Sequence, residues 1–238
     1  MTDVATLWSY LATTPLIWLT TTILAYVLAD GVARKLGYAP WANPVLLSVL
    51  LIAPVLWLTR TDYTTYFEGA QFIHFLLGPA TVALALPLWD NRHTIRTAAA
   101  PIMLALLAGS IVAAGSAILL ARAFGLPMEI LLSLAPKSTT APVALGISET
   151  IGGIPSLTAV LVILTGIIGA VTVTPIMNLL RISDWRARGF AVGVAAHGIG
   201  AARAFQVNPV AGAYAGIAMA LNALLTSLIV PVLVRWLV

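Results

Sequence analysis

Long runs of apolar residues alternate along the chain with short polar stretches. Most of these runs approach the roughly 20 residues that a helix needs to cross a bilayer. Their apolar positions are continuous rather than alternating, which is typical of spanning helices and not of membrane β-strands. The pattern predicts an all-α, polytopic membrane protein with about eight transmembrane segments, at residues 7–29, 43–58, 69–89, 98–121, 128–149, 155–180, 187–205 and 209–236.

Composition and charge support a membrane protein. Of 238 residues, 61% are hydrophobic and only 8% are charged, whereas soluble domains carry about 25% charged residues. This balance excludes an ordinary soluble enzyme, and a net charge of +4 without a Lys/Arg cluster excludes a nucleic-acid partner. The chain has no cysteine, which excludes disulfides and thiolate metal sites. Its first residues lack the basic segment of a signal peptide, so a cleaved leader is not expected.

The charges do not fix the orientation in the membrane. With eight simple crossings, four basic residues lie on one side and six on the other, which is no clear positive-inside bias. One re-entrant segment would instead place the two most basic loops together. These two loops contain Arg92 and Arg96, and Arg181, Arg186 and Arg188.

A weak internal repeat suggests inverted symmetry. Shifting the sequence by about 88 positions aligns residues 43–90 with 131–178, and three helix-breaking positions coincide: Pro54 with Pro142, Gly78 with Gly166, and Pro87 with Pro175. Chance matching in a chain rich in Leu, Ala and Val is the alternative. A real repeat would hold three helices in each unit, about 43–123 and 131–211, and an odd number makes the two copies antiparallel, as in many secondary transporters.

The first candidate site lies between Pro136 and Pro142. Both prolines oppose a continuous helix, and the residues between them are polar: Lys137, Ser138, Thr139 and Thr140. An unwound stretch followed by a half-helix would offer a cation, hydroxyls and free N–H groups to a small anion. The alternative is a loop between two short spans, with Lys137 extending to the membrane surface.

The second candidate site is the Gly-rich stretch 193–203. His197 could carry a proton or donate to a ligand, and Arg203 could hold a carboxylate. Alternatively, His197 satisfies a neighbouring carbonyl and Arg203 reaches the membrane edge. His74 and Glu149 are weaker candidates for proton coupling, because the first precedes a Gly-Pro kink and the second lies beside a loop.

One polar residue and two groups of small residues are candidates for helix packing. Asn222 could bond across helices within the last span, although packing is the favoured role. Small residues around Gly109–Gly115 and Gly212–Gly216 could pack helices within the chain or form the seam of a homodimer.

The sequence has no phosphate-binding loop, no zinc-protease motif and no paired intramembrane aspartates, so we expect no ATP, cofactor or metal.

Five ordered segments resemble the LrgB/CidB family of bacterial inner-membrane proteins. They begin with Asn43-Pro-Val-Leu-Leu, Gln71-Phe-Ile-His-Phe-Leu-Leu-Gly-Pro, Leu134-Ala-Pro-Lys-Ser-Thr-Thr-Ala-Pro, Ile151-Gly-Gly-Ile-Pro and Ala195-Ala-His-Gly-Ile-Gly-Ala-Ala-Arg. The similarity covers residues 7–236 and implies a single LrgB-like transmembrane domain over residues 1–238. It also implies a smaller LrgA/CidA-type membrane partner on a separate chain.

The resemblance leaves two functions in competition. Family members have been described as holin/antiholin-like modulators of murein hydrolases and autolysis, whereas plant relatives move glycolate and glycerate and some bacterial members are tied to pyruvate uptake. Broken polar helices, a repeat and a buried lysine serve a carrier and not a simple pore. We therefore expect a secondary transporter of small monocarboxylates that works by alternating access. A membrane enzyme is the third reading, and no nucleophile–base pair supports it.

Overall fold

The computed structural model describes residues 15–39, 41–76, 79, 82–83 and 85–237, and the elements in this part of the chain are helices. The chain divides into two compact units, Met1–Ala80 and Thr81–Val238. The boundary falls inside the first expected repeat unit, 43–123. The inverted repeat and the single domain therefore stay predictions, and each unit is described by itself.

The described residues of the first unit form three helices. They are α2 (Pro15–Lys35), α3 (Pro44–Leu58) and α4 (Tyr63–Phe75), and α2 packs against the other two. Gly69 makes this packing possible, because a Cβ there would lie 2.1 Å from the carbonyl oxygen of Pro15. Asn43 begins α3, since its Oδ1 accepts hydrogen bonds from Val45 N and Leu46 N and satisfies two otherwise free donors.

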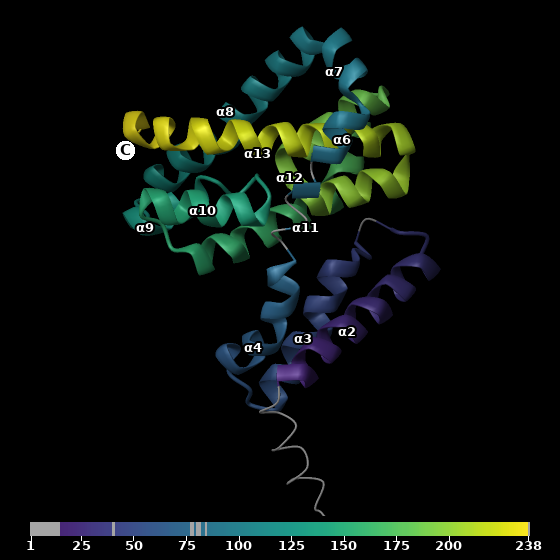
Figure 1. Ribbon diagram of the computed structural model, residues 1–238, viewed down its shortest axis with the longest axis vertical. Coiled ribbons are helices and arrows are strands. Elements are labelled where there is room, and N and C mark those ends of the chain that lie inside the picture. The colour runs from purple at the N-terminus through teal and green to yellow at the C-terminus, as the bar shows by residue number, and fades with distance from the viewer. Residues whose placement is uncertain (1–14, 40, 77–78, 80–81, 84, 238) are drawn as a thin grey trace, which may run out of the picture. The chain divides into compact units, whose positions relative to one another are not determined.

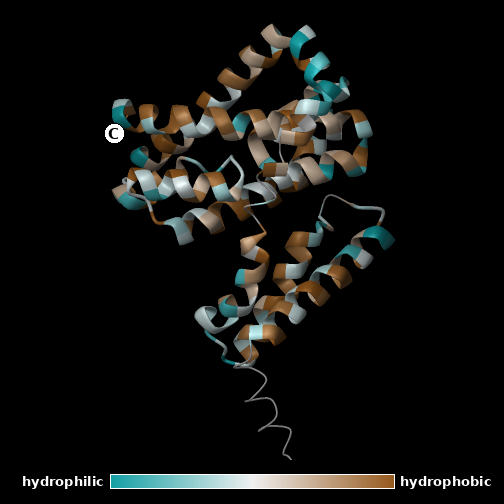
Figure 2. Ribbon diagram, viewed as in Figure 1, coloured by the Kyte–Doolittle hydropathy of each residue, from teal (hydrophilic) through white to brown (hydrophobic). Residues whose placement is uncertain are grey.

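The second unit is built around three long helices (Figure 1). These are α8 (Ala99–Ala123), α11 (Pro155–Leu179) and α13 (Pro209–Leu237). Together with α2, they are the described helices that are long and apolar enough to cross a membrane. Hydrophobic residues run along most of their length, and hydrophilic ones gather at α7 and at helix ends (Figure 2). The spans expected at 98–121, 155–180 and 209–236 are confirmed within a few residues.

Shorter elements complete this unit. α6 (Ala85–Asp90) and α7 (Arg92–Thr97) precede α8, while α9 (Met128–Leu134), α10 (Ala141–Ile151) and α12 (Trp185–Val207) lie between the long helices. The segments 128–149 and 187–205 are the interrupted helices that the sequence indicated, and neither crosses as one straight helix. The expected span 69–89 is helical up to Phe75 and again from Ala85, and part of the stretch between lies outside the described residues.

Small residues bring α12 and α13 into backbone contact. A Cβ on Gly189 would lie 2.0 Å from the carbonyl oxygen of Ala211, and one on Gly193 would lie 2.3 Å from that of Ala215. The four-residue spacing is the small-xxx-small pattern that lets membrane helices approach closely. Gly109 and Gly212, which motivated a homodimer, face Val194 and Phe205 of the same chain. Their contacts are therefore intramolecular, and the homodimer stays a prediction.

Candidate functional site

The first helix break separates α9 from α10. Residues 135–138 form turns, and Thr140 is extended (φ −62°, ψ 143°) before α10 begins with Ala141 and Pro142. The proline fixes the backbone of the first helical turn, where its missing N–H costs no hydrogen bond. The expected half-helix start at residues 139–142 is confirmed.

A buried hydroxyl cluster folds α10 back beside α9. The Thr158 hydroxyl on α11 lies 3.1 Å from the Ser133 carbonyl oxygen and 2.7 Å from Ser148 Oγ, so it joins the ends of both short helices. Ser133 Oγ also accepts from Ile154 N at 2.8 Å. A Cβ on Gly153 would lie 2.5 Å from Ser148 Oγ and 2.9 Å from Ser133 N, so position 153 has room only for glycine. The break is thus the tip of a hairpin, and α9 and α10 return to the same end of the unit.

The second break lies inside α12, at Ala196 (φ −133°, ψ 18°) and His197 (φ 40°, ψ −137°). Beyond it the helix folds back on itself, because a Cβ on Gly200 would lie 3.1 Å from the carbonyl oxygen of Val192. In a straight helix those residues would be about 12 Å apart. Gly198 and Gly200 therefore mark the break, as expected, and α12 is a second hairpin.

His197 holds the tip of this second hairpin against α11. Its Nε2 lies 2.8 Å from the Val162 carbonyl oxygen, and because a carbonyl only accepts, Nε2 carries the proton. The imidazole occupies a notch at Gly166, where a Cβ would lie 2.7 Å from His197 Cε1. The side chain is 5% exposed. It therefore satisfies a neighbouring carbonyl, which is one of the two roles that the sequence left open.

Both tips meet at one cavity of about 730 Å³. Lys137 and Ser138 line it from the first tip, and Val194 and Ala195 line it from the second. The wall is otherwise mainly apolar and comes from α8 and the start of α12: Ala98, Pro101, Ile102, Ala105, Gly109, Val112, Ala113, Ala187, Phe190 and Ala191. Arg186 and Tyr214 add polar groups. Among the described residues that line the cavity, none carries a carboxylate.

Lys137 is a charged group in the wall of this cavity, at the tip of the first hairpin. It shares the wall with Gly109 and Ala113, which are near the centre of α8, and its Nζ donates to Ser138 Oγ at 3.3 Å. Ion pairs in the described part of the chain join Arg34 to Asp30 and Arg186 to Asp184, and none includes Lys137. A half-buried cation without a carboxylate partner at this depth suits an anionic ligand.

Thr139 and Thr140 follow Ser138 in the chain and are not among the residues that line the cavity. Their side chains are buried, and their Oγ1 atoms find no hydrogen-bond partner among the described residues. Burying a hydroxyl without a partner costs about 1–3 kcal/mol, and the first N–H groups of α10 also lack partners within the helix. Donors and hydroxyls therefore stand together at the start of α10, next to the cation.

The structure does not bring every predicted site residue to this cavity. Arg203 lines a different, small hollow, together with Trp185 and Arg188. Glu149 is exposed near the end of α10. The side chain of His74 lies outside the described residues. Among those residues, no group of three or more His, Asp or Glu side chains could hold a metal ion.

The sequence did not assign two contributors to this site. Arg186 was counted as a loop charge, although it reaches the cavity lining. Asn222 is 1% exposed and bonds across helices: its Nδ2 donates to the Val194 carbonyl oxygen at 3.2 Å, and its Oδ1 accepts from Ser110 Oγ at 2.6 Å. A lone Asn in an apolar span was the available signal, and bonding across helices was the less favoured of its two readings.

Long apolar helices and two interrupted helices that meet at a cavity define a multi-pass membrane protein of the broken-helix class. A family model described as the LrgB-like family matches residues 22–236, and the chain belongs to this family.

Relatives cover nearly the whole chain. YxaC of Bacillus subtilis is 36% identical over 216 residues, which are 91% of this chain and 93% of that protein. YwbG of the same organism is 34% identical over 215 residues, or 90% and 95%. The holin-like protein CidB of Staphylococcus aureus is 31% identical over 213 residues, or 90% and 93%. None of these names describes an enzyme. No solved structure matches the chain significantly.

Proposed function

We propose that the protein is a secondary transporter of small monocarboxylates in the bacterial inner membrane. One observation carries the proposal: Lys137 stands without a carboxylate partner in a cavity where two broken helices meet. Secondary transporters place their sites where discontinuous helices meet near mid-membrane. One cation and a few donors are what a substrate with a single carboxylate needs.

In this proposal the carboxylate binds Lys137 Nζ and Ser138 Oγ. The hydroxyls of Thr139 and Thr140 and the free N–H groups of α10 become further donors when the unwound stretch shifts during transport. His197 holds the second tip in place, and a coupled proton on it would add at Nδ1, because Nε2 already carries the proton donated to Val162. Arg203 can reach the same carboxylate only after the α12 hairpin moves. Glu149 is a less direct candidate for proton coupling.

The cavity wall favours an apolar substrate body. Beyond Lys137 and Ser138, the wall near the tips is formed by Gly109, Val112 and Val194. A glycerate hydroxyl placed there would lose water without gaining a partner, whereas a methyl or isopropyl group gains about 25 cal/mol per Å² buried. We therefore place pyruvate-like 2-oxo acids ahead of glycolate and glycerate.

A holin-like role is the second candidate, because CidB relatives carry that name. A holin-like assembly permeabilises the membrane or modulates the export of murein hydrolases, and it needs no specific anion site. A homodimer and a small LrgA/CidA-type partner fit either candidate, and both remain proposals.

Uptake of labelled pyruvate into proteoliposomes separates the two candidates. A carrier predicts saturable uptake with competition among short carboxylates and no release of a larger trapped dye. Leakage that rises linearly with concentration and ignores solute chemistry would support the holin-like role instead. Protein-free liposomes and liposomes with an unrelated multi-pass protein are the controls.

A further inference from the structure

The unit Thr81–Val238 has two chemically different ends. Three helices of 25, 25 and 29 residues run between them, α8, α11 and α13, and at 1.5 Å per residue each is about as long as a bilayer is thick. Each hairpin, α9–α10 and α12, begins and finishes at one end of the unit, where the long helix before it ends and the long helix after it begins. The described helices of this unit therefore give three crossings, and the ends of the unit can be assigned from contacts.

One end gathers the start of α8, both termini of α12 and the start of α13. Ala98 and Pro101 share the cavity wall with Arg186 and Tyr214. Ile95 and Ala98 also pack against the apolar cluster that contains Phe190. Trp185 and Val207, the first and last residues of α12, line one small hollow with Met177 near the end of α11 and Ala211 near the start of α13.

The opposite end gathers the other termini. The Arg122 guanidinium at the end of α8 donates to the carbonyl oxygen of Leu237 at the end of α13. Leu131 and Ala121 share an apolar cluster against which Ile151 and Leu237 pack. The start of α9, the end of α10 and the ends of α8 and α13 therefore lie together.

Basic residues divide unequally between these ends. Besides Arg203, which lines the small hollow there, the first end carries five further arginines, Arg92, Arg96, Arg181, Arg186 and Arg188, and the second carries two, Arg122 and Arg235. This differs from the four-to-six division of eight simple crossings, because the α9–α10 hairpin moves the two most basic loops to one side. Basic residues near span ends stay on the cytoplasmic side, where the leaflet is anionic.

We propose that the five-arginine end faces the cytoplasm, so that the Lys137 cavity is a vestibule open to the cytoplasm. The cavity extends from this end, at Ala98 and Arg186, to the two hairpin tips.

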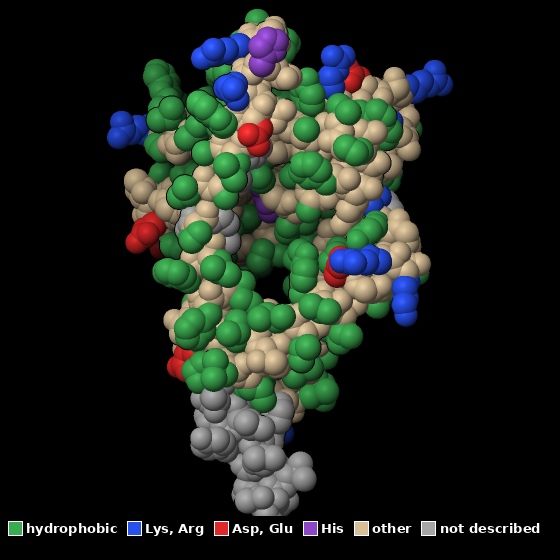
Figure 3. All heavy atoms as spheres, turned by 45° about the vertical axis from the view of Figure 1, so that its right-hand side comes forward, with side chains coloured by type: hydrophobic (Ala, Val, Ile, Leu, Met, Phe, Trp, Pro, Cys, Tyr) green, Lys and Arg blue, Asp and Glu red, His purple; other side chains and the backbone are tan. Residues whose placement is uncertain are grey.

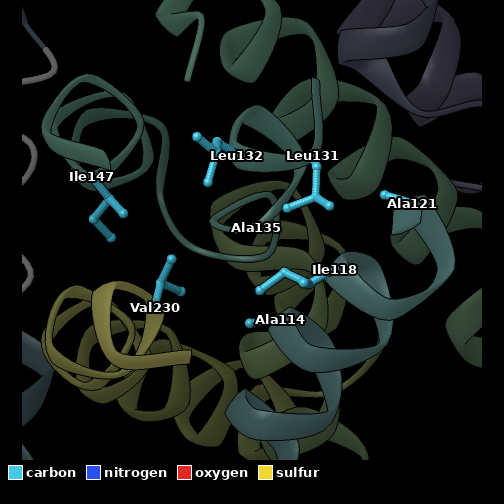
Figure 4. Packing of buried hydrophobic residues seen from close by; sticks show 8 residues of the cluster. All are labelled: Ala114, Ile118, Ala121, Leu131, Leu132, Ala135, Ile147 and Val230. Carbon is cyan, nitrogen blue, oxygen red and sulfur yellow. The ribbon is translucent and has the colours of Figure 1, made fainter. Parts of the chain in front are cut away.

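Beyond the tips, on the other side, the route is closed by an apolar plug (Figure 4). Its residues are Ala114, Ile118, Ala121, Leu131, Leu132, Ala135, Ile147 and Val230. In the picture, the labelled side chains come from several helices and gather around one space. The plug is the outer barrier of this conformation. The orientation in the membrane does not depend on the proposed substrate. Only the role of the cavity as an entrance for substrate rests on the proposed function.

Single cysteines test the orientation directly, because the natural chain has none. His93→Cys and Ser183→Cys mark the five-arginine end, and Leu126→Cys and Thr150→Cys mark the other; all four positions are exposed. Variants that react with maleimide in detergent are then treated with a membrane-impermeant maleimide in right-side-out spheroplasts and in inside-out vesicles. We expect the first pair to react at least tenfold faster in inside-out vesicles and the second pair in spheroplasts. The reverse pattern, or equal labelling from both sides, would overturn the proposal.

Ala195→Cys tests the vestibule separately, since Ala195 is exposed on the cavity wall. It should react faster in inside-out vesicles, and excess unlabelled pyruvate should slow the reaction. Faster labelling in spheroplasts would overturn the vestibule, even with the orientation confirmed. Faster labelling from the cytoplasmic side that pyruvate, chloride and acetate all leave unchanged would confirm the sidedness and count against the proposed function alone.

Discussion

The side-chain amide of Asn222 donates to the carbonyl oxygen of Val194, two residues before the break in α12. In a continuous helix that carbonyl would accept from the N–H of Gly198, but the backbone of Ala196 and His197 interrupts the ladder there. Asn222 replaces the missing donor from another helix. Because Ser110 and Thr226 both donate to Asn222 Oδ1, the amide orientation is fixed and α8, α12 and α13 are tied together beside the cavity.

Asn222→Leu should lower both stability and uptake. The change leaves the Val194 carbonyl and the Ser110 and Thr226 hydroxyls without this partner, and each buried unsatisfied group costs about 1–3 kcal/mol. Thermal unfolding in detergent should show a lower Tm by several degrees. Ser227→Ala on the same helix is the matched control, since that side chain is exposed and bonds only to its own turn. Equal Tm values for the two variants would contradict the role of Asn222.

Gly166→Ala should displace His197. The added methyl would lie 2.7 Å from His197 Cε1, and forcing extra atoms into a packed interior typically costs about 1–3 kcal/mol. Gly115→Ala on α8 is the control, because no atom lies within 4 Å of its Cβ position. We expect a lower Tm only for Gly166→Ala, with slower transport in proteoliposomes. If both substitutions leave Tm unchanged, the imidazole does not depend on this notch.

Competition between carboxylates should follow the apolar wall. Against labelled pyruvate, 2-oxobutyrate and 2-oxoisovalerate should inhibit more strongly than glycerate, because their alkyl groups bury apolar area near Val112 while glycerate brings an unpaired hydroxyl. Val112→Thr supplies a hydroxyl at that wall and should narrow the difference. A wild-type preference for glycerate would refute this assignment without affecting the carrier itself.

Low pH should remove the stabilisation that the Asp184 carboxylate gives to the start of α12. Its side chain caps the helix by accepting from Arg186 N and from the Arg186 guanidinium (2.9 Å for each closest contact), and these hydrogen bonds hold the pKa of Asp184 below its usual value. A lowered folded-state pKa means that the stabilisation is present at neutral pH and is lost as the pH falls through that pKa. Asp184→Asn should therefore lower Tm at pH about 7, and this difference should shrink as the pH falls below the ordinary Asp value of about 3.9 and vanish below the lowered pKa.

The control for this pH series is Asp90→Asn, because the ion pairs of the described residues do not include Asp90. Its Tm difference from the wild type should stay constant over the same range. A constant difference for Asp184→Asn as well would mean that its carboxylate does not contribute through ionisation. Added salt should also weaken the Asp184–Arg186 pair, since both side chains are exposed.

The sequence predicted the breaks better than the contacts around them. Pro136, Pro142 and the polar residues between them mark an unwound stretch through local chemistry alone, and the structure has it there. Hydropathy cannot distinguish a 23-residue crossing from two half-helices that fold back, because that depends on which carbonyl His197 and Asn222 reach. The convergence of Lys137 and Arg203 was therefore expected from composition, although the fold-back places them on different cavities.

The composition of the chain predicts the character of its surface but not the location of a site. Hydrophobic side chains cover much of the visible face and charged ones are few (Figure 3), as 61% hydrophobic residues require. Such a surface identifies the solvent as lipid but not the path of a substrate. That Lys137 and Arg186 line one cavity with α8 depends on tertiary contacts, which composition does not predict.

Counterflow in proteoliposomes tests the carrier and its site most directly. Vesicles loaded with unlabelled pyruvate and diluted into labelled pyruvate should show a transient accumulation of label above equilibrium, which a pore cannot produce. Losing one charge-assisted hydrogen bond costs about 1.5–3 kcal/mol, or at least about tenfold in affinity. Lys137→Met should therefore strongly reduce the overshoot at substrate concentrations near half-saturation of the wild type, while Arg235→Gln, at an exposed position near the end of α13, should keep it. An unchanged overshoot in Lys137→Met, or none in the wild type beside size-indifferent leakage, would contradict the account.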